Sequence, residues 1–169
     1  KIMIAGNHDL AIEHGYVTKQ DFIDKGIIYL ENESIEIEGI KIWGSPYTPS
    51  FGEGWAYNRK RDKLHKLWAT IPEDTDIVIT HGPPKGCLDI IKDRKNPRHE
   101  TSAGISFFRD AINNYNPSLV VCGHMHENQG KCKIGNTLVI NPGAAKDGKA
   151  VIINFNEENG KIETIKFIT

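Results

Sequence analysis

Three polar clusters hold the residues of this sequence that are best suited to bind a metal. Each follows a short apolar run: Gly6-Asn7-His8-Asp9 comes after residues 2–5, His81-Gly82 after residues 76–80, and Gly123-His124-Met125-His126 after residues 119–122. Imidazole is the side chain that most often binds first-row divalent metals. The amide oxygen of Asn7 is a neutral, weaker ligand that leaves the metal a strong Lewis acid.

The spacing inside the clusters suggests separate tasks. His124 and His126 are two residues apart, so an extended backbone points both side chains the same way. His8 follows Asn7 and points differently, so it could face a substrate as general acid, with Asp9 holding its other ring nitrogen. A single Gly-Asn-His, or one histidine after a strand, is often purely structural. All three clusters together, each at a strand end, predict a metal site.

The elements that must position these clusters alternate along the chain. We expect strands at residues 2–5, 27–30, 76–80 and 119–122, a hairpin of residues 34–37 and 40–43, and two or three strands within 137–168, with turns at 145–148 and 159–160. Helices are expected at residues 10–25, 61–71 and 103–115, the last with Ser102 as its cap. Residues 45–58 are expected to be loop. This order predicts an α/β fold with a mixed sheet and helices on its outer faces, and ligands of such sheets usually lie beyond the carboxyl ends of the strands.

Composition narrows the class of protein. A length of 169 residues fits one domain, and 21 Lys plus Arg against 22 Asp plus Glu gives a net charge of -1. That balance provides no basic footprint for nucleic acid or an anionic membrane. No apolar run approaches the ~20 residues of a membrane span. Cys87, Cys122 and Cys132 form no CxxC, so we expect three reduced thiols in a cytoplasmic protein.

The three clusters, in this order, resemble the later motifs of the calcineurin-like metallophosphoesterase superfamily, and the resemblance covers nearly the whole chain. Residues 43–49 and 71–84 resemble more narrowly the branch of metallophosphoesterase-domain-containing proteins associated with cyclic nucleotides. Some members of that branch lose the first histidine of Gly-His-x-His, which is kept here as His124.

The resemblance implies a sandwich of two mixed sheets flanked by helices, and two divalent metals bridged by a hydroxide that attacks phosphorus. Asn7, His81 and His124 would bind one metal and His126 the other. His8 would contact the substrate beside Asn7 and protonate the leaving oxygen, and Asp9 would orient His8. Mixed N and O ligands suit Mn, Fe, Zn, Co or Ni.

Two earlier motifs of the family, Asp-x-His and Gly-Asp-x-x-Asp, do not occur in the sequence. They supply most ligands of the first metal and the bridging carboxylate. We therefore expect residues 1–169 to be a single calcineurin-like phosphoesterase domain that is incomplete at its N-terminus, lacking two βα units. Fewer than two metals per chain are expected, and little activity from this chain alone.

The expected function is metal-dependent hydrolysis of phosphodiesters, cyclic nucleotides among them, or of phosphomonoesters, so the expected partner is a phosphoester or nucleotide. The phosphodiester expectation rests on the branch alone. One alternative is a catalytically impaired nucleotide-binding or interaction module that holds at most one metal. Another is one part of a two-chain phosphoesterase, with an N-terminal segment or a second polypeptide completing the site and covering the strand edge near residues 1–5.

Several other side chains could either contact a substrate or have a structural role. Trp55, Tyr57 and Asn58 could meet a nucleobase, although filling the core is the better interpretation of the aromatic residues. Residues 59–61 could contact phosphate or form a solvated charge run. Glu127 could support a ligand histidine from behind.

Overall fold

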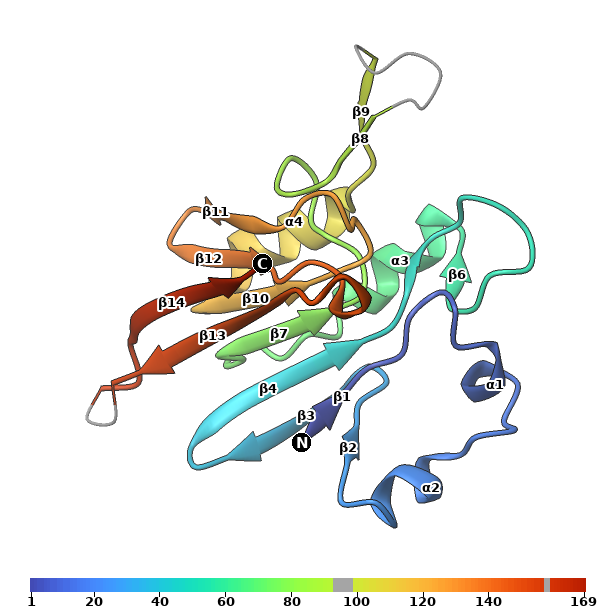
Figure 1. The fold of residues 1–169 in the computed structure, drawn as a ribbon, viewed down its shortest axis with the longest axis horizontal. Helices are drawn as coiled ribbons and strands as arrows, with labels where there is room; N and C mark the ends of the chain where they lie inside the picture. The colour runs from blue at the N-terminus through green and yellow to red at the C-terminus, as the bar shows by residue number, and fades with distance from the viewer. Residues whose placement is uncertain (93–98, 157–158) are drawn as a thin grey trace.

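The fold centres on a six-stranded mixed sheet (Figure 1). The computed structural model describes residues 1–92, 99–156 and 159–169. The strand order is β11-β12-β10-β7-β4-β3, with the four inner strands parallel and the two outer ones antiparallel to their neighbours. The bounds are β3 Glu33–Ile37, β4 Ile40–Ser45, β7 Ile77–Thr80, β10 Leu119–Cys122, β11 Gly130–Ile134 and β12 Thr137–Asn141. Continuous apolar sequences such as those of β7 and β10 are typical of parallel strands buried on both faces.

A second layer of strands covers one face of this sheet. It consists of the parallel pair β1 (Ile2–Met3) and β2 (Ile28–Tyr29) and the antiparallel pair β13 (Ala150–Phe155) and β14 (Ile162–Ile168). Both pairs share one apolar cluster with the central sheet, built around buried Leu30, Ile42 and Ile140. The two strand layers therefore form a sandwich.

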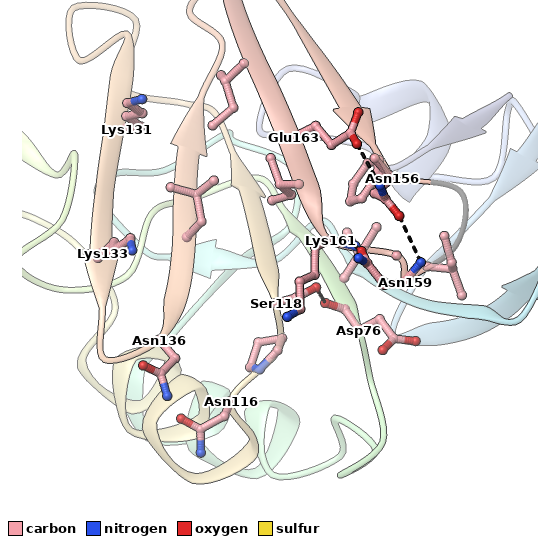
Figure 2. A pocket seen from close by; sticks show the side chains of 18 of the residues that line it. Asp76, Asn116, Ser118, Lys131, Lys133, Asn136, Asn156, Asn159, Lys161 and Glu163 are labelled. Carbon is pink, nitrogen blue, oxygen red and sulfur yellow. Dashed lines mark hydrogen bonds between the residues drawn. The ribbon is translucent and has the colours of Figure 1, made fainter.

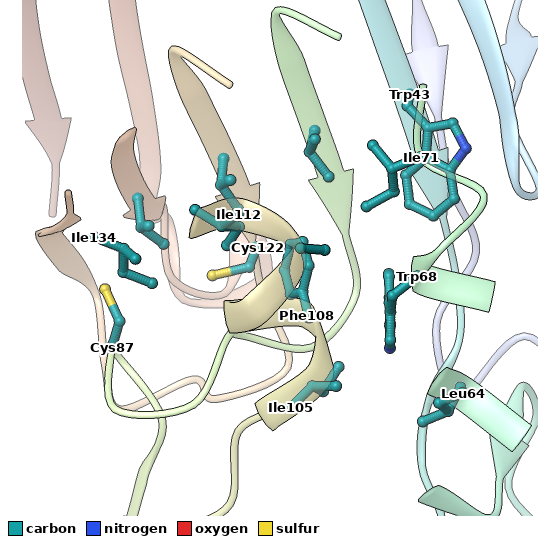
Figure 3. Packing of buried hydrophobic residues seen from close by; sticks show 14 residues of the cluster. Trp43, Leu64, Trp68, Ile71, Cys87, Ile105, Phe108, Ile112, Cys122 and Ile134 are labelled. Atoms are coloured by element: carbon teal, nitrogen blue, oxygen red, sulfur yellow. The ribbon is translucent and has the colours of Figure 1, made fainter. Parts of the chain in front are cut away.

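Helices cover the opposite face. Helix α3 (Arg61–Trp68) and helix α4 (Ser106–Tyr115) bury Leu64, Trp68, Phe108 and Ile112 against the sheet, where Trp68 meets Trp43 of β4 (Figure 3). These apolar positions recur three or four residues apart, which places them on one face of each helix. The predicted mixed α/β sandwich with outer helices is thus confirmed.

Short elements join these layers. They are α1 (Leu10–Glu13), α2 (Lys19–Ile23), the parallel pair β5 (Thr48–Pro49) and β6 (Asn58–Arg59), the antiparallel pair β8 (Ile90–Lys92) and β9 (Glu100–Ser102), and a 3₁₀ turn at Ala145–Asp147. Within the described ranges, no helix is long and apolar enough to cross a bilayer.

Several local predictions were wrong. Residues 10–25 form two short helices instead of one, interrupted at Gly15, which adopts φ +76°. Helix α4 begins at Ser106, and Ser102 lies in β9, where its hydroxyl donates to Asp89 instead of capping the helix. Residues 45–58 include β5 and the start of β6.

The cysteine expectation is wrong for two of the three residues. Cys87 and Cys132 are paired as a disulfide with Cα atoms 6.2 Å apart, whereas Cys122 is free and buried in β10. The two cysteines are 45 residues apart in sequence, and their pairing was missed because β11, which carries Cys132, was not predicted. Its Gly-Lys-Cys-Lys-Ile sequence contains too little apolar character to indicate a strand.

Candidate metal centre

Two of the three polar clusters leave the central sheet side by side. Thr80 at the end of β7 lies opposite both Ser45 of β4 and Cys122 of β10, so His81 and Gly123 follow neighbouring parallel strands at the same edge. The Gly123 amide donates to the His81 carbonyl at 3.0 Å. This hydrogen bond holds together the two segments that follow β7 and β10. The expected position beyond the carboxyl ends of the strands is confirmed for these clusters.

The third cluster reaches the same point from the second layer. After β1 the chain continues to Asn7, whose side chain is buried. Its Oδ1 lies 2.7 Å from His81 Nε2 and 3.2 Å from His124 Nδ1, and the two imidazole rings are 4.8 Å apart. One amide oxygen and two ring nitrogens from three segments of the chain therefore converge.

Local backbone structure explains how these side chains meet. The His81 ring packs directly on Gly6, because a Cβ at Gly6 would lie only 2.5 Å from His81 Cε1. The Gly6 amide donates to Asp9 Oδ2 at 2.6 Å, and the Asp9 amide donates back to the Gly6 carbonyl, which closes a tight turn around Asn7. His124 adopts φ +66°, a left-handed conformation that costs a non-glycine residue energy and is concentrated at functional sites.

The remaining predicted site residues, His8, Asp9 and His126, are not part of the group formed by the Asn7, His81 and His124 side chains. His8 is exposed, and its ring stands edge-on to Trp55 with centroids 4.9 Å apart. Asp9 is engaged with the Gly6 amide, and among the described residues no hydrogen bond joins it to His8. His126 is also exposed, and among the hydrogen bonds of the described residues none joins it to Asn7, whose side-chain oxygen meets His81 and His124.

Burial and neighbouring imidazoles keep the central histidines neutral. Desolvation, followed by the charges of His124, His8 and His126, lowers the pKa of His81 to about 3. The pKa of His124 is lowered for the same reasons, first by burial and then by His126 and His8. A neutral imidazole is the form that binds a metal, so the local electrostatics suit that role.

The metal-free protein is expected to lose stability as pH falls from about 6.5 to about 3, because of His81. In this range the unfolded chain protonates this imidazole, with a pKa of 6.5, while the folded protein does not. The free energy of unfolding should therefore decrease by up to about 1.4 kcal/mol per pH unit. Urea unfolding at several pH values measures the free energy of unfolding for the wild type, for His81→Gln and for the control variant His65→Gln. The expectation is contradicted if the free energy of unfolding depends on pH in the same way in the wild type and in His81→Gln.

The donor set fits a divalent metal in part. Two imidazole nitrogens and an amide oxygen suit Mn, Fe, Co, Ni or Zn. Yet within residues 1–92, 99–156 and 159–169, no group of three or more His, Cys, Asp or Glu side chains is arranged to hold a metal. The three residues therefore resemble one side of a coordination shell, without the carboxylates that would balance a dication.

The other candidates for substrate contact are mostly occupied elsewhere. Tyr57 is buried in the core, and Asn58 donates to Thr48 and Ala56, so neither is free to meet a base. Arg59 pairs with Glu13 and lies over the Tyr47 ring, and Arg61 donates to the Gly104 carbonyl. Glu127 is exposed. Trp55 differs from these residues, since it is exposed beside His8.

A hollow lies at the opposite edge of the sheet. It is an open depression of about 1660 Å³ between the β13–β14 pair and the amino ends of the parallel strands, near Asp76, Ser118 and Lys161 (Figure 2). None of the predicted site residues lines it. The convergent donors at the carboxyl edge, and not cavity size, therefore identify the candidate site.

Comparison with known proteins gives a consistent result. The sequence profile of the family described as "Metallophosphoesterase, calcineurin superfamily" matches residues 60–167. "Metallophosphoesterase domain-containing protein 1" of Homo sapiens is 34% identical over 165 residues, covering 83% of this chain and 49% of that protein. A UPF0046 protein of Caenorhabditis elegans is 30% identical over 165 residues, covering 89% of this chain and 54% of its own length. The chain thus spans about half the length of these curated relatives.

A solved crystal structure shares the fold. It superposes on 98% of this chain and 64% of its own chain with a TM-score of 0.65, at 19% sequence identity. At this identity the likeness concerns the arrangement of the strands and helices alone.

Proposed function

Because the chain belongs to the calcineurin-like metallophosphoesterase superfamily, in the branch of metallophosphoesterase-domain-containing proteins, we propose that it carries one side of a metal centre that hydrolyses phosphodiesters. The observation that supports this is the convergence of Asn7 Oδ1 with His81 Nε2 and His124 Nδ1 at the carboxyl edge of the sheet. These two histidines lie within the region that the family profile matches, and Asn7 lies before it.

Asn7, His81 and His124 would hold one divalent metal, and His126 a second in the full-length polypeptide that carries residues 1–169. When bound, the metals would supply Lewis acidity and neutralise charge that develops on the phosphoryl group. Within this chain, burial keeps the His81 imidazole neutral and its lone pair available. The turn closed by Gly6 and Asp9 holds Asn7 in place, so little reorganisation is needed when a metal arrives.

His8 is the proposed general acid. Its ring is exposed at the rim of the centre, where it can reach a bound ester and give a proton to the departing oxygen. Asp9 contributes in a different way from the expected one, because its carboxylate fixes the Gly6 amide and thereby the turn that carries His8. Substrates of the proposed reaction are phosphodiesters with small organic ester groups, including cyclic nucleotides.

His8→Ala is expected to slow hydrolysis of poor leaving groups most, because only these need a proton in the transition state. With Mn²⁺-loaded full-length polypeptide, kcat for an alkyl phosphodiester should fall about 100-fold or more. For bis(p-nitrophenyl) phosphate, whose leaving group departs as a stable anion, the loss should be far smaller. Steady-state kinetics on both substrates measures the difference.

His14→Ala provides the matched control, since His14 is an exposed histidine at the end of α1 and outside the centre. Equal losses on both substrates in His8→Ala would argue against a proton donor and for a role in binding. If the wild type binds Mn²⁺ but hydrolyses neither ester, the proposed function is wrong.

A further inference from the structure

The backbone makes a sharp three-residue turn at His124. The Met125 amide donates to the Gly123 carbonyl at 2.7 Å, and His124 between them adopts φ +66°. A three-residue turn with a positive φ at its centre is a rare and strained conformation for a residue that has a side chain. Such strain persists only where surrounding contacts impose it. Other parts of the fold must therefore hold this turn.

The turn gives the two histidines of this cluster different surroundings. The His124 ring is half-buried, and its Nδ1 lies 3.2 Å from Asn7 Oδ1. His126, two residues later, is exposed. An extended backbone would point both side chains the same way. The positive φ at His124 therefore accounts for the approach of this imidazole alone to Asn7.

A buried asparagine holds the turn from the neighbouring strand. Asn141 is the last residue of β12, which lies beside β10 in the central sheet (Figure 1). Its side chain is buried, and its Nδ2 donates to the Met125 carbonyl at 2.8 Å. Its Oδ1 accepts from the Gly143 amide at 2.9 Å. Asn141 thus ties the residue that follows His124 to the end of β12.

The two contacts of Asn141 require the two different ends of a carboxamide. The Met125 carbonyl can only accept and the Gly143 amide can only donate, so together they need a donor and an acceptor on one side chain. Asparagine provides both. An ionised aspartate has the same shape but offers only acceptors, so it keeps the contact with Gly143 and loses the contact with Met125.

The oxygen that faces His124 is held independently of β12. The Asn7 carbonyl accepts from the Ala56 amide at 3.0 Å, which belongs to the loop of residues 50–58. The tight turn around Asn7 holds this residue as well. The separation of Asn7 Oδ1 from His124 Nδ1 therefore depends, on the histidine side, on the turn that Asn141 holds.

We propose that Asn141 is a positioning residue of the metal centre, which acts through the Met125 carbonyl to keep His124 in the strained turn that directs its imidazole to Asn7. The proposal rests on the proposed function, because His124 is a metal ligand only there. Asn141 itself touches neither metal nor substrate. Groups that orient a metal ligand from behind typically contribute 10- to 100-fold to metal affinity.

A competing interpretation is that Asn141 only satisfies a buried carbonyl and thereby stabilises the fold. Thr137, at the other end of β12, has a role of that kind. It is buried, and its hydroxyl donates to the Pro117 carbonyl at 2.6 Å, at the sheet edge opposite the candidate metal centre. Thr137→Val is therefore a matched control for the loss of a buried hydrogen bond from the same strand.

The test is calorimetric titration of the full-length polypeptide with Mn²⁺, together with urea unfolding of each metal-free variant. Asn141→Asp removes the donor and keeps the acceptor for Gly143. Asn141→Ser is the milder second variant, which decides the question if the aspartate does not fold. Asn136→Asp, in the exposed turn between β11 and β12, is the control for the added negative charge.

We expect Asn141→Asp to weaken Mn²⁺ binding about 10- to 100-fold. Asn141→Ser should also weaken it, because its side chain is one bond shorter and leaves the Met125 carbonyl without this donor. Thr137→Val should be less stable but bind Mn²⁺ like the wild type, and Asn136→Asp should change neither property. Unchanged or higher Mn²⁺ affinity in a folded Asn141 variant, or an equal loss in Thr137→Val, would overturn the proposal.

A second readout separates positioning from direct participation in catalysis. Because a bound metal itself orders the imidazole, saturating Mn²⁺ should restore most of kcat for bis(p-nitrophenyl) phosphate in Asn141→Asp. The Mn²⁺ concentration needed for half of this activity should rise about 10- to 100-fold. A kcat that stays low in the folded variant at saturating Mn²⁺ would contradict a pure positioning role.

Failure of the proposed function is recognised separately. It would appear as Mn²⁺ binding by the wild type without hydrolysis of bis(p-nitrophenyl) phosphate. A selective loss of Mn²⁺ affinity in the Asn141 variants would then still support the positioning role, and only the catalytic role would be removed. A wild type that binds no Mn²⁺ would overturn both.

Discussion

Asn7→Ala is expected to lower kcat/KM for phosphodiester hydrolysis at least about 100-fold, together with a large loss of Mn²⁺ affinity. Asn7 Oδ1 is the atom shared by His81 and His124, so its removal leaves two half-buried imidazoles facing each other without an oxygen between them. Even partners that only support metal ligands typically contribute 10- to 100-fold, and a direct ligand should contribute more. Calorimetric Mn²⁺ titration and steady-state kinetics on the full-length polypeptide measure both effects.

Two further variants make this result specific. Asn7→Asp keeps an oxygen at the same place and adds the negative charge that a dication prefers, so it should restore Mn²⁺ binding. His65→Ala removes an exposed histidine of α3 outside the centre and should leave both measurements unchanged. If Asn7→Ala binds Mn²⁺ like the wild type, Asn7 is no ligand.

Gly6→Ala is expected to reduce metal affinity nearly as strongly, although it adds one methyl group and removes no ligand. That methyl carbon would lie 2.5 Å from His81 Cε1 and 2.7 Å from Nδ1, closer than such atoms approach. The imidazole must therefore shift from its present position beside Asn7 Oδ1. Displacements of about 1 Å can change rates 100-fold in a positioned site. Mn²⁺ titration of the variant tests the expectation, with circular dichroism to verify folding.

Gly123→Ala is the matched comparison. Like Gly6, Gly123 directly precedes a proposed metal ligand, here His124, but the nearest atom to its added Cβ would be the His81 carbonyl oxygen at an ordinary 3.7 Å. We expect near-normal Mn²⁺ affinity here. Equal losses in the two variants would mean that backbone flexibility, and not contact with the His81 ring, explains the effect at Gly6.

The elements that place the ligands could be predicted because each has a strong local pattern. Strands β7 and β10 are indicated directly by their continuous apolar residues. The β3–β4 hairpin is indicated by the Glu38-Gly39 turn between its two strands. Parallel strands end at the same edge of a sheet, so the three polar clusters that follow strands were expected to lie close together. The convergence of Asn7, His81 and His124 is consistent with that reasoning.

Other features depend on contacts between distant residues. Strand β11 has alternating lysines and little apolar character, and it forms because β12 offers an edge, so its disulfide to Cys87 was missed with it. Asp9 follows His8 in sequence, but its carboxylate turns to the Gly6 amide. Phe51 and Trp55 were predicted as loop residues, and only their ring contacts with the two histidines show what they border.

The hydrogen bond from Ala56 to Asn7 has a thermodynamic consequence. It joins the loop of residues 50–58 to the residue that would hold the metal in the proposed function, so an event that orders one of them also orders the other. Binding free energies coupled in this way are reciprocal. If metal loading raises the affinity for a phosphoester, the phosphoester must raise the affinity for the metal by the same factor, and the protein would retain its metal best when that phosphoester is abundant.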